Sequence, residues 1–175
     1  MACPRCARPA VRLLVGDLTR PGKSALTRLA GLPVLDPIGL MVCYRLAHAA
    51  YHSAARPLAW ILTAVMDVIY GCDIHPAACL GERAHFAHTR GVVIGPGVVI
   101  DADVVIHGNV TLGVDDAGAF PSLGGSVTVY AGAVVIGGIR VGDGARIGAN
   151  AVAHQDVPPG ALCVGVPGRI VDRVA

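Results

Sequence analysis

Aliphatic residues and alanine recur every six positions through the second half of the chain. The longest run consists of Leu123, Val129, Val135, Val141, Ile147 and Ala153. An earlier run consists of Ile74, Leu80 and Phe86, followed after a two-residue slip by Ile94, Ile100, Ile106 and Leu112. A β-sandwich would alternate with period two, whereas a six-residue period is typical of coils built from three short strands and three tight corners. The sequence therefore predicts a mainly β fold, a parallel β-helix of hexapeptide repeats.

A different pattern precedes the repeats. Apolar residues recur there three and four positions apart, as on one face of a helix. We expect helical segments over 24–30, 37–53 and 57–71. Asp36 is a suitable N-cap and Pro37 suits the first helical position. The β-helix should therefore be preceded by a small α-helical cap.

These patterns divide the chain into four parts. Residues 1–20 form an N-terminal tail and entry segment, 21–72 the helical cap, 73–163 the β-helix and 164–175 a C-terminal segment. The polar, glycine-rich stretch 114–122 cannot continue a hexapeptide coil, and we expect it to leave the coil as a loop. Loops of this kind commonly carry binding residues.

Composition argues against two classes of partner. Apolar residues make up 54% of the chain, but the longest apolar run, 57–72, contains Thr63 and Asp67. It is shorter than the roughly 20 residues that a membrane helix needs. A formal net charge of +2 and 4% aromatic residues provide neither the basic surface nor the stacking groups typical of nucleic-acid binding. No signal peptide is evident, so we expect a cytoplasmic protein with no membrane span and no nucleic-acid partner.

Six cysteines without an evident secretory signal are expected to be free thiols. Cys3 and Cys6 form a CxxC pair, but a zinc site needs two further ligands at a suitable spacing and none follows. His48 and His52, four residues apart on a predicted helix, also lack a third ligand. We therefore expect no metal, and the role of Cys3 and Cys6 stays open.

Several short motifs resemble a known family. They are Tyr-Arg-Leu-Ala-His at 44–48, Asp-Ile-His-Pro-Ala at 73–77, His88 with Gly-Val-Val-Ile-Gly at 91–95, Val-Thr-Leu-Gly at 110–113, and the segments 157–160 and 165–170. With them the chain resembles the hexapeptide-repeat acyltransferases, and within these the serine O-acetyltransferase family, closest to its short members. The resemblance implies a left-handed β-helix, association of three subunits, and acetyl-CoA as the acyl donor in a groove between neighbouring coils. It leaves the choice between trimer and hexamer open.

Acyl transfer from a thioester to an alcohol requires a base, because a hydroxyl group is a weak nucleophile at neutral pH. The resemblance places His88 at the position of the family's catalytic base. Asp73 stands fifteen residues earlier, nearly one coil, and is expected to hydrogen-bond the ring nitrogen that is not acting as base. His107, about one coil after His88, is the alternative base.

The residues expected around the acceptor depart from the family pattern. The family has an Asp-His pair where this chain has Ala87 and His88, and a histidine before proline where it has Phe120. Both changes remove groups that surround the amino acid acceptor in the family. His107 and Asn109 lie on one predicted corner and are expected to face the acceptor. L-Serine should therefore be a poor acceptor compared with a bulkier or less charged alcohol that can use the ring of Phe120, unless Asp115, Asp116 or His107 replaces the missing contacts.

The phosphopantetheine arm of CoA is long and thin, so it needs a surface free of large side chains. Ala131 and Ala149 are eighteen residues apart, one coil, and should stack on the same corner. The resemblance implies that their backbones, with Gly113, contact the arm. Arg146 and Arg169 are candidate partners for the CoA phosphates.

The sequence thus predicts an acetyl-CoA-dependent O-acetyltransferase that acts as a homotrimer on a small hydroxyl-bearing acceptor. Two alternatives stay open. One is an O-acyltransferase for a sugar, a polysaccharide precursor or a secondary metabolite. The other is a non-catalytic hexapeptide scaffold, which Ala87 and Phe120 favour and the pair of His88 and Asp73 opposes. Neither the acceptor nor the accepted acyl chain length follows from the sequence.

Overall fold

Three parallel β-sheets form the sides of a β-helix in the computed structural model, which describes residues 37–171. The first sheet contains β1 (Asp73–Ile74), β4 (Val93–Ile94), β7 (Thr111–Gly113), β10 (Val134–Ile136) and β13 (Val152–Ala153). The second contains β2 (Cys79–Leu80), β5 (Val99–Ile100), β8 (Ser122–Leu123) and β11 (Arg140–Val141). The third contains β3 (His85–Phe86), β6 (Val105–Ile106), β9 (Thr128–Val129), β12 (Arg146–Ile147), β14 (Leu162–Val164) and, antiparallel at its edge, β15 (Arg169–Val171). The predicted parallel β-helix is confirmed.

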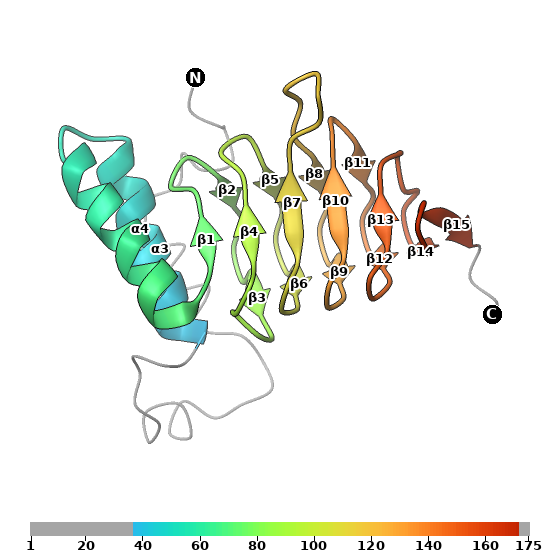
Figure 1. The fold of residues 1–175 in the computed structure, drawn as a ribbon, viewed down its shortest axis with the longest axis horizontal. Coiled ribbons are helices and arrows are strands. Elements are labelled where there is room, and N and C mark those ends of the chain that lie inside the picture. The colour runs from blue at the N-terminus through green and yellow to red at the C-terminus, as the bar shows by residue number, and fades with distance from the viewer. Residues whose placement is uncertain (1–36, 172–175) are drawn as a thin grey trace.

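Each coil visits the three sheets in turn. In Figure 1 the chain rises along the first sheet, passes over the top to the second sheet behind, and returns through the third sheet below while advancing away from the helices. This is a left-handed sense, contrary to the usual right-handed crossover between parallel strands. The left-handed coil that the family resemblance implies is therefore present.

The pairing of strands accounts for the six-residue period. Val93 pairs with Thr111, and Val134 with Val152, so that partners lie 18 residues apart, three hexapeptides per coil. Asp73 pairs with Val93, 20 residues further on, and this longer coil contains the two-residue slip. The repeat therefore keeps the same type of side chain in register from coil to coil.

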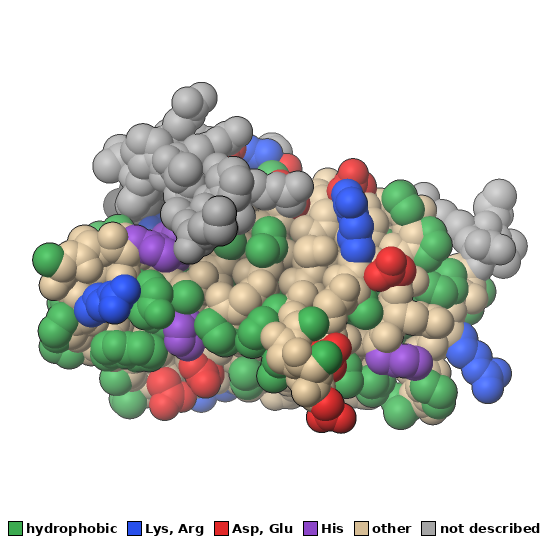
Figure 2. All heavy atoms as spheres, turned by 90° about the horizontal axis from the view of Figure 1, so that it is seen from above, with side chains coloured by type: hydrophobic (Ala, Val, Ile, Leu, Met, Phe, Trp, Pro, Cys, Tyr) green, Lys and Arg blue, Asp and Glu red, His purple; other side chains and the backbone are tan. Residues whose placement is uncertain are grey.

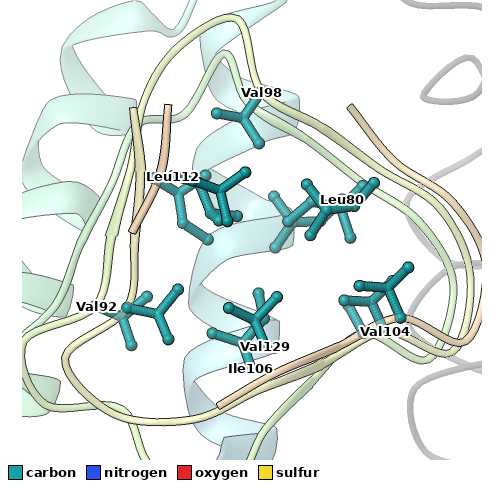
Figure 3. Close-up of a cluster of buried hydrophobic side chains, with 14 of the residues drawn as sticks. Leu80, Val92, Val98, Val104, Ile106, Leu112 and Val129 are labelled. Atoms are coloured by element: carbon teal, nitrogen blue, oxygen red, sulfur yellow. The ribbon is translucent and has the colours of Figure 1, made fainter. Parts of the chain in front are cut away.

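The core is a column of aliphatic side chains inside the three-sided coil. Most strands have two residues, of which one points inward and is fully buried while the other faces outward. Figure 3 shows the labelled side chains pointing from all three sides toward the interior; they are Leu80, Val92, Val98, Val104, Ile106, Leu112 and Val129. Burial of apolar surface at about 25 cal/mol per Å² is the main stabilising contribution to such a stack.

The predicted loop leaves the coil between β7 and β8 and projects from the body in Figure 1. It covers 114–121, because β8 begins at Ser122. Across it Thr111 pairs with Val134, 23 residues away, five more than in a regular coil. Asp115 shapes the loop, since its Oδ1 accepts the N–H groups of Ala117 at 3.0 Å and Ala119 at 2.9 Å.

Two helices, α3 (Pro37–Tyr51) and α4 (Arg56–Tyr70), cover the N-terminal end of the β-helix. They lie where the sequence predicts them. Gly71 ends α4 with a φ of +65°, a conformation that glycine adopts without strain, and its N–H donates to the carbonyl of Asp67. The segment predicted over 24–30 and the predicted N-cap Asp36 lie outside the described residues.

Side chains of α3 complete the hydrogen bonding of the first coil. In each coil of the parallel ladder, carbonyl groups accept N–H groups from the preceding coil, but β2 has no preceding strand in its sheet. The hydroxyl of Tyr44 donates to the carbonyl of Ala78 at 2.6 Å, and the guanidinium of Arg45 donates to the carbonyl of Leu80. Both side chains are buried. Since unpaired buried carbonyls are costly, the motif at 44–48 has a structural role at this edge.

Exposed apolar side chains gather at the helical end of the molecule, as Figure 2 shows. On α3 and α4 the large ones are Leu46, Leu58, Trp60, Ile61, Val68 and Ile69. Within residues 37–171, neither helix has the length and apolar character needed to cross a membrane.

The described cysteines fall into two kinds. Cys43, Cys72 and Cys163 are buried free thiols. Burial, with smaller contributions from the Asp67 and Asp73 carboxylates, raises the pKa of Cys72 to about 12. Cys79 is disulfide-bonded, so the expectation of free thiols is wrong for this residue. Disulfide formation depends on which segments meet in space, and the cysteine spacing carries no such information.

Candidate active site

Most candidate site residues lie along one edge of the β-helix, where the chain turns from the third sheet into the first. Successive coils pass this edge at 87–91, 107–109, 130–132 and 148–150. We call it the His88 corner. Backbone hydrogen bonds join its coils, as from the N–H of Gly132 to the carbonyl of Gly108 at 3.0 Å.

His88 is exposed at this corner. Gly108 lies beside it in the next coil, because a Cβ atom built on Gly108 would be 3.3 Å from the Cβ of His88. The imidazole rings of His88 and His107 have centroids 6.3 Å apart and planes inclined by 57°. Thr89 holds the adjoining turn by donating its hydroxyl to the carbonyl of Tyr70 at 2.9 Å. The proposed base is thus open to solvent, next to a second imidazole.

Tyr130 also lies at the His88 corner, although the sequence did not single it out. Its ring stacks on that of His107, with centroids 5.2 Å apart and an interplanar angle of 28°. The coil that separates the two residues contains the 114–121 excursion, so their spacing is 23 rather than 18. Counting in steps of 18 from His107 therefore passes over Tyr130, and only an alignment that allows for the excursion would find it.

Small residues continue in register from His88 along the corner. The strand registers place Gly108, Ala131 and Ala149 in line with it in the next three coils. Ala131 and Ala149 are exposed. The predicted stacking of the two alanines on one corner is present, while their contact with CoA stays a prediction.

Asn109 has an evident structural role at the same corner. Its φ is +57°, in the left-handed region that asparagine tolerates better than most residues. A Cβ atom on Gly91 would lie 2.1 Å from its Oδ1, so its side chain lies over Gly91. Asn150 has the same relation to Gly132 further along the β-helix. This repetition explains asparagine at 109 by corner geometry, and its predicted contact with the acceptor remains a prediction.

Asp73 begins β1, at the edge of the first sheet that borders the His88 corner, and pairs with Val93 of the next coil. It is exposed, and its backbone N–H donates to the carbonyl of Val92 at 2.9 Å. Its charge acts on nearby groups: burial lowers the pKa of His75, and the carboxylate of Asp73 opposes this shift. Within residues 37–171 its carboxylate makes no hydrogen bond to His88. The orienting contact between the two side chains remains a prediction.

Two predicted residues lie at the opposite edge of the first sheet, where the chain turns into the second sheet. Gly113 ends β7, and Phe120 belongs to the excursion that follows. The Phe120 ring lies over Gly95 and Gly97, where added Cβ atoms would be 2.5 Å and 2.3 Å from ring carbons. We call this edge the Phe120 corner. Within one subunit, therefore, Gly113 and Phe120 do not join the residues of the His88 corner.

The two arginines lie toward the C-terminal end of the third sheet. Arg146 begins β12 and Arg169 begins β15, and both are exposed. Val164, the pairing partner of Arg169, belongs to β14, the strand next to β12. Both guanidinium groups thus face solvent on one sheet, and their contact with phosphates stays a prediction.

Two histidines away from the His88 corner have backbone hydrogen-bond partners. The Nδ1 of His75 accepts the N–H of Ala77 at 3.0 Å. The Nδ1 of His48 donates to the carbonyl of Pro76 at 2.8 Å. Among residues 37–171, no three His, Cys, Asp or Glu side chains are grouped so that they could hold a metal ion.

Known relatives share this architecture. No family model matches the chain. Serine acetyltransferase of Mycobacterium tuberculosis is 42% identical over 133 residues, which cover 74% of this chain and 58% of that protein. Serine acetyltransferase of Helicobacter pylori is also 42% identical, over 141 residues, or 78% of this chain and 81% of that protein. The chain belongs to the serine acetyltransferase family.

Solved structures of the serine acetyltransferase family support this assignment. The Neisseria gonorrhoeae enzyme superposes with a TM-score of 0.83 at 31% identity, over 95% of this chain and 67% of that one. A serine acetyltransferase in complex with CoA superposes with a TM-score of 0.82 at 34% identity, over 93% of this chain and 69% of that one. The chain spans less than three fifths of the length of several curated relatives that it matches.

Proposed function

We propose that this chain is an acetyl-CoA-dependent O-acetyltransferase acting on a small hydroxyl-bearing acceptor in the cytoplasm. One observation carries the proposal. His88 is exposed at a corner where the small residues Gly108, Ala131 and Ala149 continue in register with it. A base at the end of a row of small residues is what a thin thioester arm and a hydroxyl acceptor require.

In the proposed reaction His88 accepts the proton of the acceptor hydroxyl while the oxygen attacks the thioester carbonyl. The C–S bond then breaks, the acyl group passes to the oxygen, and the CoA thiolate leaves and takes up the proton. Asp73 orients the imidazole and stabilises its charged form, as the third member of a catalytic triad does. His107 is the alternative base.

We place the complete site between subunits of a homotrimer. The proposed residues fall into two groups on opposite edges of the first sheet: His88, Ala131 and Ala149 at one corner, Gly113 and Phe120 at the other. Three subunits side by side bring the His88 corner of one against the Phe120 corner of the next, and closed cyclic association is the usual solution for homo-oligomers. The CoA arm then runs between them toward Arg146 and Arg169.

The proposed acceptor is an alcohol without an amino acid head group, such as a sugar, a polysaccharide precursor or a secondary metabolite. The structure of soybean serine acetyltransferase has been solved in complex with serine. Here Ala87 offers no charge to the ammonium group of an amino acid, and Phe120 offers a ring in place of a polar side chain. A charge-assisted hydrogen bond contributes roughly 1.5 to 3 kcal/mol, so its loss weakens serine recognition.

The test measures acetyl transfer to a panel of alcohols that includes L-serine. The decrease in the ultraviolet absorbance of the thioester bond reports the rate. We expect His88→Ala to lower the rate about a hundredfold or more, the usual scale for a positioned base, with CoA affinity nearly unchanged. His52→Ala, at an exposed histidine just after the end of α3, is the control. Full activity of His88→Ala would assign the base to His107 or end the base hypothesis. A wild-type protein that binds CoA but acetylates no alcohol would be the scaffold.

A further inference from the structure

We propose that His107 and Tyr130 form an aromatic platform on which a ring-bearing acceptor lies while His88 takes the proton of its hydroxyl group. This inference rests on the proposed function and specifies its substrate class. The expected acceptor is an alcohol carried on a pyranose or aromatic ring, with an apolar face at least the size of an imidazole.

Tyr130 covers one face of the platform, and a small residue lies in register with His107 on the other side. The ring of Tyr130 covers one face of the His107 imidazole, at a centroid distance of 5.2 Å. In the preceding coil, on the side away from Tyr130, the strand register makes Ala87 the partner of His107. Ala87 ends in a methyl group and is half-buried, so no long side chain at this position covers the imidazole.

The imidazole of His107 lies beside the proposed base. The rings of His88 and His107 are inclined by 57° with centroids 6.3 Å apart. A ring lying flat on His107 therefore has one edge toward His88, and a hydroxyl group on that edge comes within reach of the base. Gly108 leaves the backbone beside His88 free of a side chain.

The surroundings of the platform favour an uncharged ligand. In the two rows that contain His88 and His107, the in-register positions of the neighbouring coils are Ala87, Gly108, Tyr130, Ala131, Gly148 and Ala149, none of which carries a charge. An ammonium group placed here loses water without gaining a carboxylate in these rows, which is unfavourable. The C–H face of a sugar or an aromatic ring instead gains stacking contacts.

Tyr130 acts through His107 and is therefore a positioning residue. Aromatic pairs prefer offset or tilted arrangements with centroids about 4.5 to 7 Å apart, and such a pair restricts both rings. At 36% exposure Tyr130 is accessible from solvent, yet its stacked face fixes the plane of His107. Phenylalanine at 130 keeps that face, whereas leucine removes it.

Kinetics with defined acceptors test the platform. The ring probes are methyl β-D-galactopyranoside and 2-phenylethanol, and the small charged probe is L-serine. We expect at least one ring probe to exceed L-serine in kcat/KM by tenfold or more. Tyr130→Leu should raise the KM of that probe about three- to tenfold and leave the KM of acetyl-CoA unchanged, while Tyr130→Phe stays within twofold of wild type. Tyr51→Leu, which removes a ring from the helical end, is the control.

Each contrary result overturns the platform. L-Serine used more efficiently than both ring probes excludes it, as does a Tyr130→Leu variant with wild-type acceptor KM. A rise in the KM of acetyl-CoA alone would make Tyr130 part of the donor site instead.

Ligand binding separates this inference from the proposed function. Histidine ring signals in NMR spectra report contact with His107 without any reaction. Shifts of the His107 signals with a ring probe, present in wild type and Tyr130→Phe but lost in Tyr130→Leu, support the platform even if no acetyl transfer occurs. Transfer without such shifts would keep the proposed function and reject the platform.

Discussion

At the scale of the residue, side chains no larger than a methyl group decide what approaches His88. Ala87, Gly108 and Ala131 lie beside it or in the neighbouring coils, and Ala149 continues the row. Their small size leaves the backbone accessible, which a long and thin acyl donor requires. At position 87, alanine in place of the family's aspartate removes a charge, and its methyl group is the side chain in register with His107.

Tryptophan in this row tests the donor path. We expect Ala131→Trp or Ala149→Trp to abolish measurable CoA binding, because an indole ring occupies the surface along which the arm is proposed to pass. Both positions are exposed, so the coil should remain folded. Isothermal titration calorimetry measures the affinity, with Ala64→Trp on the exposed side of α4 as the control. Unchanged CoA affinity in both corner variants would place the cofactor elsewhere.

At the scale of the element, α3 is fastened to the first coil by side chains that replace a missing strand. Arg45 donates to the carbonyl of Gly81 at 2.6 Å in addition to that of Leu80. His48 donates from Nδ1 to the carbonyl of Pro76. Burial lowers the pKa of His48, and the charges of His52 and Arg45 act in the same direction, while the hydrogen bond to Pro76 opposes them. The neutral form of His48 is therefore the one that the folded protein favours.

This pKa shift predicts acid sensitivity. Unfolded His48 binds a proton near pH 6.5, whereas the folded protein resists protonation to lower pH. The unfolded state thus binds more protons, so this contribution to stability is present above about pH 6.5 and is lost as the pH falls through the folded pKa. His75, whose pKa is also lowered by burial, adds in the same direction. We expect the melting temperature to fall between pH 7 and pH 5.

The variant His48→Asn tests whether protonation of His48 causes the loss of stability at low pH. The asparagine amide can donate to the Pro76 carbonyl without titrating, so this variant should lose less melting temperature on acidification than wild type. His154→Asn, at an exposed position, should behave as wild type. Identical pH profiles for wild type and His48→Asn in thermal denaturation would exclude His48 as the cause.

At the scale of the whole molecule, residues that are one coil apart in the sequence lie in register on the same edge of the β-helix. The His88 corner and the Phe120 corner run along the β-helix on either side of the first sheet. Neither edge alone contains all the residues proposed for acetyl transfer. A site assembled from both requires at least two subunits, and a ring of three gives every subunit the same environment.

Mixed oligomers test this arrangement. Light scattering coupled to size-exclusion chromatography should give a mass three times the chain mass of 17.8 kDa. His88→Ala and Gly113→Trp should each be inactive alone, but coexpression should restore about one quarter of the activity, because that share of random interfaces pairs an intact His88 corner with an intact Phe120 corner. A monomeric protein with full activity, or coexpression without recovery, would contradict the shared site.

Much of the fold could be predicted from the sequence because the β-helix repeats one local rule. Most strands bury one side chain, so an aliphatic residue every six positions specifies the core directly, and Ile94, Ile100 and Ile106 are all buried. The slip before Ile94 and the excursion at 114–121 were equally readable, since each breaks the repeat at a definite place. His88 was found through the family resemblance, which names a residue but does not give its distances from neighbouring side chains.

Only the tertiary structure decided which candidate residues meet. The excursion shifts the register by five residues, and this shift, invisible to a count in steps of 18, brings Tyr130 onto His107. The division of the candidates between two corners depends on where each coil turns, and the disulfide state of Cys79 depends on which segments fold together. The periodic sequence thus determined the coil, because its contacts are local, whereas the site is made of contacts between coils and between edges.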